Sequence, residues 1–375
     1  MLGYLWAKRG LYMKVDGVFY RTIWLSNNGW AVNIIDQTKL PFEFVITRLE
    51  TLQQTVSAIA DMQVRGAPLI GATGAYGMAL AAHFNSSDEY LREAHRLLLS
   101  ARPTAVNLRW ALEKLINILL GSPISERESI AYKEAAKICD HDVSICSLIG
   151  DNGKALIVDC IAKKADKSPI NILTHCNAGW LAAVDWGTAL APIYKAFDAG
   201  LSLHVWVDET RPRNQGASLT AWELSRHKVP HTVITDNAGG HLMQHGKVDL
   251  CIVGTDRTTR TGDVCNKIGT YLKALAAHDN NVPFYVALPS PTIDWTIQDG
   301  IREIPIEERS QHEVGHISGV TSQGKLVNVR IANESSEAAN PAFDVTPSRL
   351  ITGLITERGI CGASQASLEK LFPEN

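Results

Sequence analysis

The alternation of apolar and polar residues changes its period twice along the chain. Between about Gly17 and Val45, apolar residues alternate with polar ones in short runs such as Val18–Trp24 and Ala31–Ile35, which predicts a small antiparallel sheet. Apolar positions then recur at helical spacing, which predicts helices over Leu52–Asp61, Ala67–Phe84, Ser87–Leu99, Ala105–Leu119 and about Ser125–Leu148. The first part of the chain is therefore expected to be a small sheet followed by helices.

From about Lys154 to Leu288, apolar β-branched runs alternate with amphipathic segments. The expected helices between the strands are Thr188–Ala199, Ser218–His227, Gly239–His245 and Asn266–His278. Strand–helix repeats of this length require parallel pairing with right-handed crossovers. We therefore predict an α/β fold in which an N-terminal sheet-plus-helices domain (residues 1–150) precedes a doubly wound parallel sheet (residues 151–375). The boundary rests on the change of pattern alone.

The last part of the chain is less regular. Residues 303–340 are charged and rich in loop-forming residues. The stretch Asn340–Pro347 is expected to open a C-terminal helical tail, with Thr346 as N-cap and Pro347 at the first helical position.

Composition narrows the class of protein. The chain has 375 residues, of which 45% are hydrophobic and 20% charged, with a formal net charge of −3. This charge gives no electrostatic reason to expect a nucleic-acid partner, and no run reaches the roughly 18 apolar residues that a membrane span needs. The stretch before Met13 does not resemble a signal peptide, and Met13 is a possible alternative start. The seven cysteines are odd in number and form no CxxC pair, so we expect reduced thiols and a cytoplasmic location.

Two candidate catalytic residues lie at expected strand ends. Cys176 follows the apolar run Ile170–Thr174, and Asp256 follows Leu250–Val253. Ligands of open parallel sheets bind outside the carboxyl ends of the strands, and a carboxylate next to an apolar strand is easily desolvated, which suits proton transfer. The structural alternatives are a buried inert thiol and an ion pair between Asp256 and Arg257. His175 points away from Cys176 in an extended segment and is expected to have a packing role.

Candidate anion-binding groups lie at helix starts. Arg65, Gly66 and Ala67 precede a small-residue helix whose free N–H groups could bind phosphate; tight glycine packing is the alternative. Arg102 precedes a second helix, and Asn266 and Lys267 are expected to begin a third. The glycines at 71, 74 and 77 lie inside a helix and are not a dinucleotide fingerprint.

A metal site is not expected. His204, Asp208, His231 and His241 could be imagined as ligands, but no pair among them has the HExxH or CxxC spacing. The acidic and basic residues that follow the second strand, Asp208 to Arg213, form either a catalytic group or a charge network that orients the Gln215-Gly216 turn.

Taken together, these segments resemble the methylthioribose-1-phosphate isomerase family over nearly the whole chain from about Gly17. The resemblance rests on several motifs in order: Arg65-Gly66-Ala67-Pro68, Arg102-Pro103-Thr104-Ala105-Val106-Asn107-Leu108, Thr174-His175-Cys176-Asn177-Ala178-Gly179, Asp208-Glu209-Thr210-Arg211-Pro212 with Gln215-Gly216, Thr235-Asp236-Asn237, Gly254-Thr255-Asp256-Arg257 and Gly262-Asp263-Val264-Cys265-Asn266-Lys267-Ile268-Gly269-Thr270. It implies a Rossmann-like C-terminal domain, a site in the cleft between the domains, and a homodimer that needs no metal or other cofactor.

The resemblance also implies the reaction and its residues. The family converts 5-methylthioribose 1-phosphate to 5-methylthioribulose 1-phosphate in methionine salvage, and some relatives accept or prefer 5-deoxyribose 1-phosphate. The family's catalytic pair falls on Cys176 and Asp256, and its substrate-binding positions fall on Arg65, Gly66, Ala67, Arg102, Gln215, Asn266 and Lys267. The same fold occurs in regulatory subunits of a translation-initiation nucleotide-exchange factor, so a non-catalytic sugar-phosphate-sensing protein is the alternative. A Cys-dependent hydrolase is a further alternative.

Overall fold

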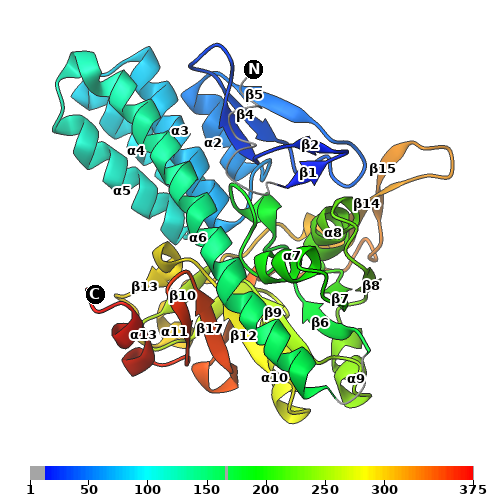
Figure 1. The fold of residues 1–375 in the computed structure, drawn as a ribbon. Helices are drawn as coiled ribbons and strands as arrows, with labels where there is room; N and C mark the ends of the chain where they lie inside the picture. The colour runs from blue at the N-terminus through cyan, green and yellow to red at the C-terminus, as the bar shows by residue number, and fades with distance from the viewer. Residues whose placement is uncertain (1–12, 165–167, 375) are drawn as a thin grey trace.

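The molecule has a helical half and a sheet half, joined by one long helix (Figure 1). The computed structural model describes residues 13–164 and 168–374, so the stretch before Met13 lies outside the described residues. In the helical half, the predicted antiparallel sheet is confirmed, with β4 (Val32–Ile35) between β3 (Ile23–Leu25) and β5 (Ile46–Leu49); a hairpin of β1 (Lys14–Val15) and β2 (Val18–Phe19) precedes it.

The predicted helices of this half are also present: α2 (Leu52–Ala60), α3 (Ala67–Phe84), α4 (Asp88–Ala101) and α5 (Val106–Leu120). Helix α3 is buried on all sides, and its glycines let neighbouring helices approach closely. A Cβ atom at Gly74 would lie 2.4 Å from Leu108 Cδ1 of α5. These glycines therefore serve helix packing.

The long helix α6 (Arg127–Lys163) continues well beyond the predicted end near Leu148. Glycine usually weakens a helix, which favoured an end before Gly150 and Gly153. Here both glycines face α7 (Ala191–Asp198), and a Cβ at Gly153 would lie 2.4 Å from Pro192 Cγ. Residue 150 lies inside this continuous helix, and the division of the chain into residues 1–150 and 151–375 stays a prediction.

The sheet half is built on a seven-stranded sheet with the order β18-β17-β12-β9-β6-β7-β8. Its strands are parallel except for the edge pair β17–β18. The strand order reverses between β6 and β9, as in doubly wound dinucleotide-binding folds, so the predicted fold class is confirmed. The strands are β6 (Ile170–Thr174), β7 (Leu203–Asp208), β8 (His231–Ile234), β9 (Leu250–Val253), β12 (Phe284–Ala287), β17 (Gly353–Thr356) and β18 (Gly359–Cys361). The helices after α7 include α8 (Ala221–Arg226), α9 (Ala238–Gln244), α10 (Thr270–Asp279) and α13 (Gln365–Leu371).

A second sheet, with the order β13-β10-β11-β16, corrects two predictions. Asn266 and Lys267 do not begin a helix; they end the buried strand β11 (Val264–Lys267), and α10 starts after Gly269, whose φ of +102° separates the two elements. The predicted helical tail from Pro347 is also wrong: Thr346 ends β16 (Phe343–Thr346), which pairs antiparallel with β11, and only the single 3₁₀ turn Ser348–Leu350 follows Pro347 before β17 begins. The remaining strands of this sheet are β10 (Arg257–Thr259) and β13 (Ile293–Asp294).

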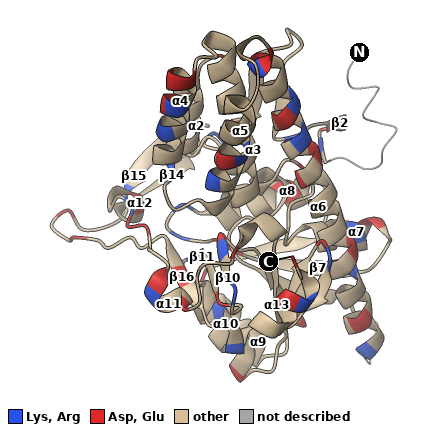
Figure 2. Cartoon of the chain, turned by 90° about the vertical axis from the view of Figure 1, so that its left-hand side faces the viewer, with Lys and Arg blue, Asp and Glu red and all other residues tan. Residues whose placement is uncertain are grey.

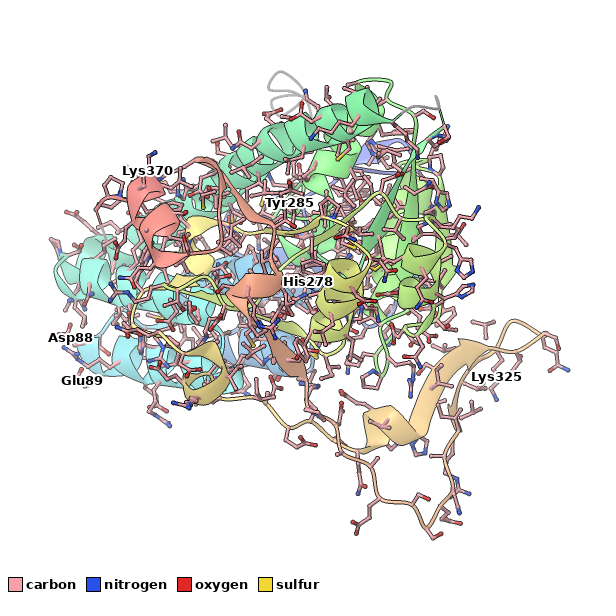
Figure 3. All side chains as sticks on the ribbon, turned by 90° about the horizontal axis from the view of Figure 1, so that it is seen from below. Asp88, Glu89, His278, Tyr285, Lys325 and Lys370 are labelled. Carbon is pink, nitrogen blue, oxygen red and sulfur yellow. The ribbon has the colours of Figure 1, made fainter. Side chains whose placement is uncertain are left out.

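A two-stranded arm leaves the sheet half between α11 (Gly300–Glu303) and β16. It consists of α12 (His312–Gly315), β14 (His316–Val320) and β15 (Leu326–Arg330), and it projects from the body, with Lys325 at its outer part (Figure 3). Figure 2 shows basic and acidic residues interspersed on outer helices such as α4 and α13. Among the described residues, no helix has both the length and the apolar character for crossing a membrane.

Candidate active site

The two expected catalytic residues follow the two strands at which the strand order reverses. Strands β6 and β9 are neighbours in the sheet, although β7 and β8 come between them in the sequence. Cys176 follows β6 and Asp256 follows β9, and both line one enclosed cavity of about 30 Å³. Ligands of doubly wound folds bind in the crevice at this reversal. The position predicted from the strand pattern thus coincides with a real cavity.

Cys176 is held in a conformation that few side chains adopt. Its φ is +62°, its N–H donates to Thr210 Oγ1 over 2.8 Å, and its carbonyl accepts from Thr220 Oγ1 over 2.7 Å. Burial raises the pKa of the thiol, and the charges of Arg65 and Lys267 partly oppose that shift. The thiol is therefore stabilised in its protonated form, as a proton donor.

Asp256 lies in the turn between β9 and β10. Burial raises the pKa of its carboxyl group above the ordinary value, while Lys267, Arg65 and Arg102 act in the opposite direction. The alternative ion pair with Arg257 is not formed: the Arg257 guanidinium lies 3.4 Å from Asp294 and donates to the carbonyl of Thr104. Asp256 is thus available for proton transfer.

The start of α3 forms one wall of this cavity, which Arg65, Gly66, Ala67 and Asn266 line together with the catalytic pair. Gly66 has a φ of +92°, and a Cβ there would lie 2.4 Å from the carbonyl oxygen of Ala182, so only glycine fits. The free N–H groups at this helix start favour an anion.

Arg102 reaches the site from the end of α4. It lines an adjoining cavity of about 30 Å³ with Ala67, Asp256 and Cys265. Its side chain is only 12% exposed, one of its nitrogens lies 3.3 Å from Glu307, and its Nε and Nη1 have no hydrogen-bond partner among the described residues. Buried donors without acceptors are costly, which marks this arginine as prepared for an anionic ligand.

The remaining binding candidates differ in their relation to this cavity: Asn266 lines it, Lys267 interacts electrostatically with Cys176 and Asp256, and Gln215 lines a neighbouring cavity that shares Arg65 with it. Lys267 is buried, which lowers the pKa of its ammonium group, and its Nζ lies 4.5 Å from the ring centroid of Phe343. Asn266 donates to Thr270 Oγ1 over 3.0 Å. Gln215 precedes a π-helical turn at Gly216–Thr220 and leaves its buried Oε1 without a partner among the described residues. Gln215 and Arg65 also line a larger cavity of about 270 Å³.

His175 takes part in a buried charge network. Its Nδ1 lies 2.9 Å from Asp208 and its Nε2 lies 2.8 Å from the carbonyl oxygen of Ile268. Its ring is therefore engaged with β7 and the end of β11, in line with the expected packing role.

The metal candidates do not form an open ligand set. In the described parts of the chain, the group that could hold a metal is His175, Asp208 and Asp236. Both nitrogens of the imidazole are already hydrogen-bonded, and the ammonium of Lys273 lies 3.4 Å from Asp208. The Asp208 carboxylate thus already has a cationic partner.

One motif escaped the sequence analysis. His312-Glu313-Val314-Gly315-His316 has the HExxH spacing of zinc hydrolases. In the structure it forms only the single turn α12, and Glu313 is bound to Arg309 and Arg213 at 2.8 Å each. These partners lower the pKa of Glu313 to about 2 against the effect of burial. This carboxylate cannot act as the base that such a hydrolase requires.

Comparison with known proteins gives one consistent family. The model of the initiation factor 2 subunit family matches residues 63–363. The methylthioribose-1-phosphate isomerase of Paramagnetospirillum magneticum is 64% identical over 362 residues, which cover 96% of this chain and 99% of the relative. The Escherichia coli O45:K1 protein of the same name is 59% identical over 96% of this chain and 97% of its own length.

Two solved structures extend the likeness to the fold. The 5-methylthioribose 1-phosphate isomerase from Pyrococcus horikoshii OT3 superimposes with a TM-score of 0.83 at 38% identity, covering 98% of this chain and 99% of the other. The translation initiation factor eIF-2B subunit delta from A. fulgidus gives a TM-score of 0.77 at 38% identity, over 94% of this chain and 99% of the other.

Proposed function

The chain belongs to the methylthioribose-1-phosphate isomerase family, and from this premise we propose that Cys176 and Asp256 are the catalytic pair with which it converts 5-methylthioribose 1-phosphate to 5-methylthioribulose 1-phosphate. The observation that carries the assignment is the placement of this thiol and this carboxyl group on one cavity at the sheet reversal, beside the helix start at Gly66. An aldose–ketose isomerase needs proton donors and acceptors at two adjacent carbons, together with a hold on the phosphate.

The substrate sets the order of the chemistry. Phosphate on the anomeric carbon prevents spontaneous opening to a free aldehyde, so the enzyme opens the furanose while keeping the C1–O–phosphate linkage. The bond between C1 and the ring oxygen breaks, and the ring oxygen takes a proton. C2 gives up a hydrogen, C1 gains one, and the C2 hydroxyl loses its proton to become the ketone. No proton is consumed overall.

Asp256 gives the proton to the ring oxygen and later accepts the proton of the C2 hydroxyl. Its raised pKa keeps a fraction of the carboxyl group protonated at higher pH than an ordinary aspartate. Cys176 then serves as base and acid at carbon through an enediol-type intermediate: its thiolate form, which the charges of Arg65 and Lys267 favour against the effect of burial on the pKa, takes the proton from C2, and the resulting thiol returns it to C1. A direct hydride shift from C2 to C1, with the pair only polarising oxygens, is the rival route; turnover in deuterium oxide separates them, since only the enediol route introduces solvent deuterium at carbon.

Arg65, the Gly66 and Ala67 amides, Arg102 and Lys267 hold the phosphate, while Gln215 and Asn266 bind sugar hydroxyls. The support for this assignment is that Arg65, Gly66, Ala67 and Asn266 line the cavity of Cys176 and Asp256, that Arg102 lines the adjoining one, and that two nitrogens of Arg102 have no partner among the described residues. They supply orientation rather than chemistry.

The 5-substituent extends toward the larger cavity, whose lining includes Leu40, Met62 and Leu219. This space accommodates methylthio and also hydrogen, so 5-deoxyribose 1-phosphate is proposed as a second substrate.

The protein acts in the cytoplasm as a homodimer. The test is kcat/KM of the purified protein with the methylthio, deoxy and hydroxyl sugar phosphates; activity with none of them would refute the proposed function.

The likeness to an eIF-2B subunit keeps a regulatory role as the competing candidate. A regulatory protein would bind the sugar phosphate without converting it. Equilibrium binding measured beside turnover distinguishes these two functions.

A further inference from the structure

Asn177, the residue directly after Cys176, has hydrogen-bond partners for both ends of its side-chain amide and for its backbone carbonyl. Arg65 donates from Nη1 to Asn177 Oδ1 and from Nη2 to the Asn177 carbonyl oxygen, the second over 2.7 Å. Asn177 is 2% exposed and Arg65 9% exposed, so water does not compete for these bonds. A buried charge-assisted pair of bonds fixes both the position and the direction of the guanidinium.

The other end of the Asn177 side chain is held as firmly. Its Nδ2 donates to Glu223 Oε1 over 2.8 Å and to Thr220 Oγ1 over 3.2 Å. Glu223 is fully buried and also accepts from the backbone N–H groups of Trp180 and Leu181 and from the Tyr194 hydroxyl, at 2.8 to 2.9 Å. The amide thus has one orientation only: oxygen toward Arg65, nitrogen toward Glu223.

The same residue also touches the thiol. The backbone N–H of Asn177 is hydrogen-bonded to Cys176 and lowers the pKa of the thiol, as does the charge of Arg65, although burial raises that pKa more. Thr220, which accepts from the Asn177 side chain, donates to the Cys176 carbonyl over 2.7 Å. Asn177 is therefore joined to the reacting sulfur on one side and to the anion-binding arginine on the other.

We propose that Asn177 is a positioning residue that fixes the distance and angle between the thiol of Cys176 and the guanidinium of Arg65, with Glu223 as its fixed support. Substrate phosphate bound to Arg65 is thereby placed at a set distance from the sulfur. This inference rests on the proposed roles of Cys176 and Arg65 in the isomerisation.

The residue type follows from the charges. An aspartate at 177 would place a carboxylate beside Glu223 and would neutralise Arg65, whereas an alanine would leave Arg65 without its side-chain acceptor and Glu223 with Tyr194 as its side-chain donor. The amide of Asn177 accepts from the one and donates to the other at the same time, through two different atoms. The sequence signal was the place of Asn177 inside the Cys176 motif, but its partners come from distant parts of the chain.

The test combines turnover with a measurement that needs no turnover. Asn177→Ala, Asn177→Asp and Arg65→Ala are compared with the control Asn152→Ala, which removes one amide hydrogen bond of 2.8 Å to the Thr356 carbonyl. The first readout is the pH profile of Cys176 alkylation by iodoacetamide, with the reaction of a Cys176→Ser variant subtracted. Both Asn177→Ala and Arg65→Ala should move the profile to higher pH, because the thiol loses the nearby fixed charge; Asn152→Ala should not.

The second readout is a double-variant cycle in kcat/KM. Loss of a hydrogen bond to a charged group should cost Asn177→Ala about 10-fold or more, while the double variant Arg65→Ala/Asn177→Ala should be no slower than Arg65→Ala alone. Losses that multiply, or an Asn177→Ala alkylation profile equal to that of the wild type, would overturn the proposal.

If the Asn177 variants do not fold, Arg65→Lys tests the same link from the other end. A lysine keeps the charge but cannot donate in the two-nitrogen geometry, so the alkylation profile should again move to higher pH; an unchanged profile would overturn the proposal. An inactive wild type with a shifted profile in the variants would refute the isomerase function and leave the coupling standing.

Discussion

The two sides of the site differ in how completely their polar groups are hydrogen-bonded. Beside Cys176, Asn177 and Glu223 use their donors and acceptors within the protein. Elsewhere around the site, two nitrogens of Arg102 and Oε1 of Gln215 are buried without partners among the described residues. Unmade hydrogen bonds cost free energy that a ligand can recover. The thiol side is therefore preorganised, whereas under the proposed function the substrate would supply the missing partners of Arg102.

The comparison predicts the largest effect for the thiol itself. Cys176→Ser should leave the fold and phosphate affinity largely intact, because serine fits the same space, while kcat falls by about 10²- to 10⁴-fold for loss of an acid–base group. Steady-state kinetics check the rate, and competition by inorganic phosphate checks the affinity. A serine variant that retains more than about a tenth of wild-type kcat would remove Cys176 from the chemistry.

Removal of the phosphate-binding cation at the α3 start should act mainly on binding. Arg65→Ala should raise KM strongly, because the charge-assisted bond to phosphate exists in both the ground and the transition state. An unchanged KM with every phosphorylated sugar would exclude the start of α3 from the anion site.

The unpartnered side allows a change in the opposite direction. Arg102→Ala should raise KM about 10-fold or more, whereas Glu307→Gln should lower KM moderately, because Glu307 lies 3.3 Å from Arg102 and competes with the phosphate. The exposed Arg109 on α5 provides the control variant Arg109→Ala, with KM near the wild-type value. Equal KM values in all three variants would mean that Arg102 is only structural.

A smaller effect concerns buried carboxyl groups away from the site. Burial raises the pKa of Asp185 to about 7, so its protonated form is favoured by folding. Stability is then greatest below the unfolded-state pKa and falls as pH rises toward 7, by roughly 1.4 kcal/mol for each pH unit between the unfolded-state and folded-state pKa values. In Asp185→Asn the loss of Tm between pH 5 and pH 8 should shrink; the exposed control Asp159→Asn should keep the wild-type difference. An undiminished loss in Asp185→Asn would contradict the raised pKa.

Chelation should have the smallest effect. Activity is expected to survive EDTA without added nucleotide, because the proposed chemistry runs through Cys176 and Asp256 alone. Loss of activity on chelation, with recovery on adding one divalent metal, would contradict the metal-free mechanism.

The strand-end positions of the proposed catalytic pair could be predicted from the sequence because strand ends are local features. Parallel strands deliver their carboxyl ends to one edge, so Cys176 and Asp256 could be placed from their own neighbourhoods. The strand β11, which contains Asn266 and Lys267, could not be predicted in this way. It pairs with β16, a segment much later in the sequence, and no local pattern of residues reveals that pairing. The length of α6 was predicted wrongly for the same reason. Gly153 lies inside the helix because Pro192 of α7 packs closely against it, and this contact with a distant residue cannot be read from the local sequence.

The two nitrogens of Arg102 that lack a hydrogen-bond partner among the described residues could not be predicted from the sequence either. A sequence shows that an arginine is present, but not which of its donors lack acceptors after the chain has folded. The same holds for Glu313, whose HExxH context suggests a metal until its two arginine partners are known.

The most direct test of the central claim is Asp256→Asn. Asparagine keeps the shape and can hydrogen-bond, but it cannot exchange a proton at neutral pH. The account predicts that Kd for the substrate stays near the wild-type value while kcat falls by at least about 100-fold, with one limb of the wild-type pH–rate profile missing in the variant. A folded Asp256→Asn protein that turns over at the wild-type rate would contradict the account.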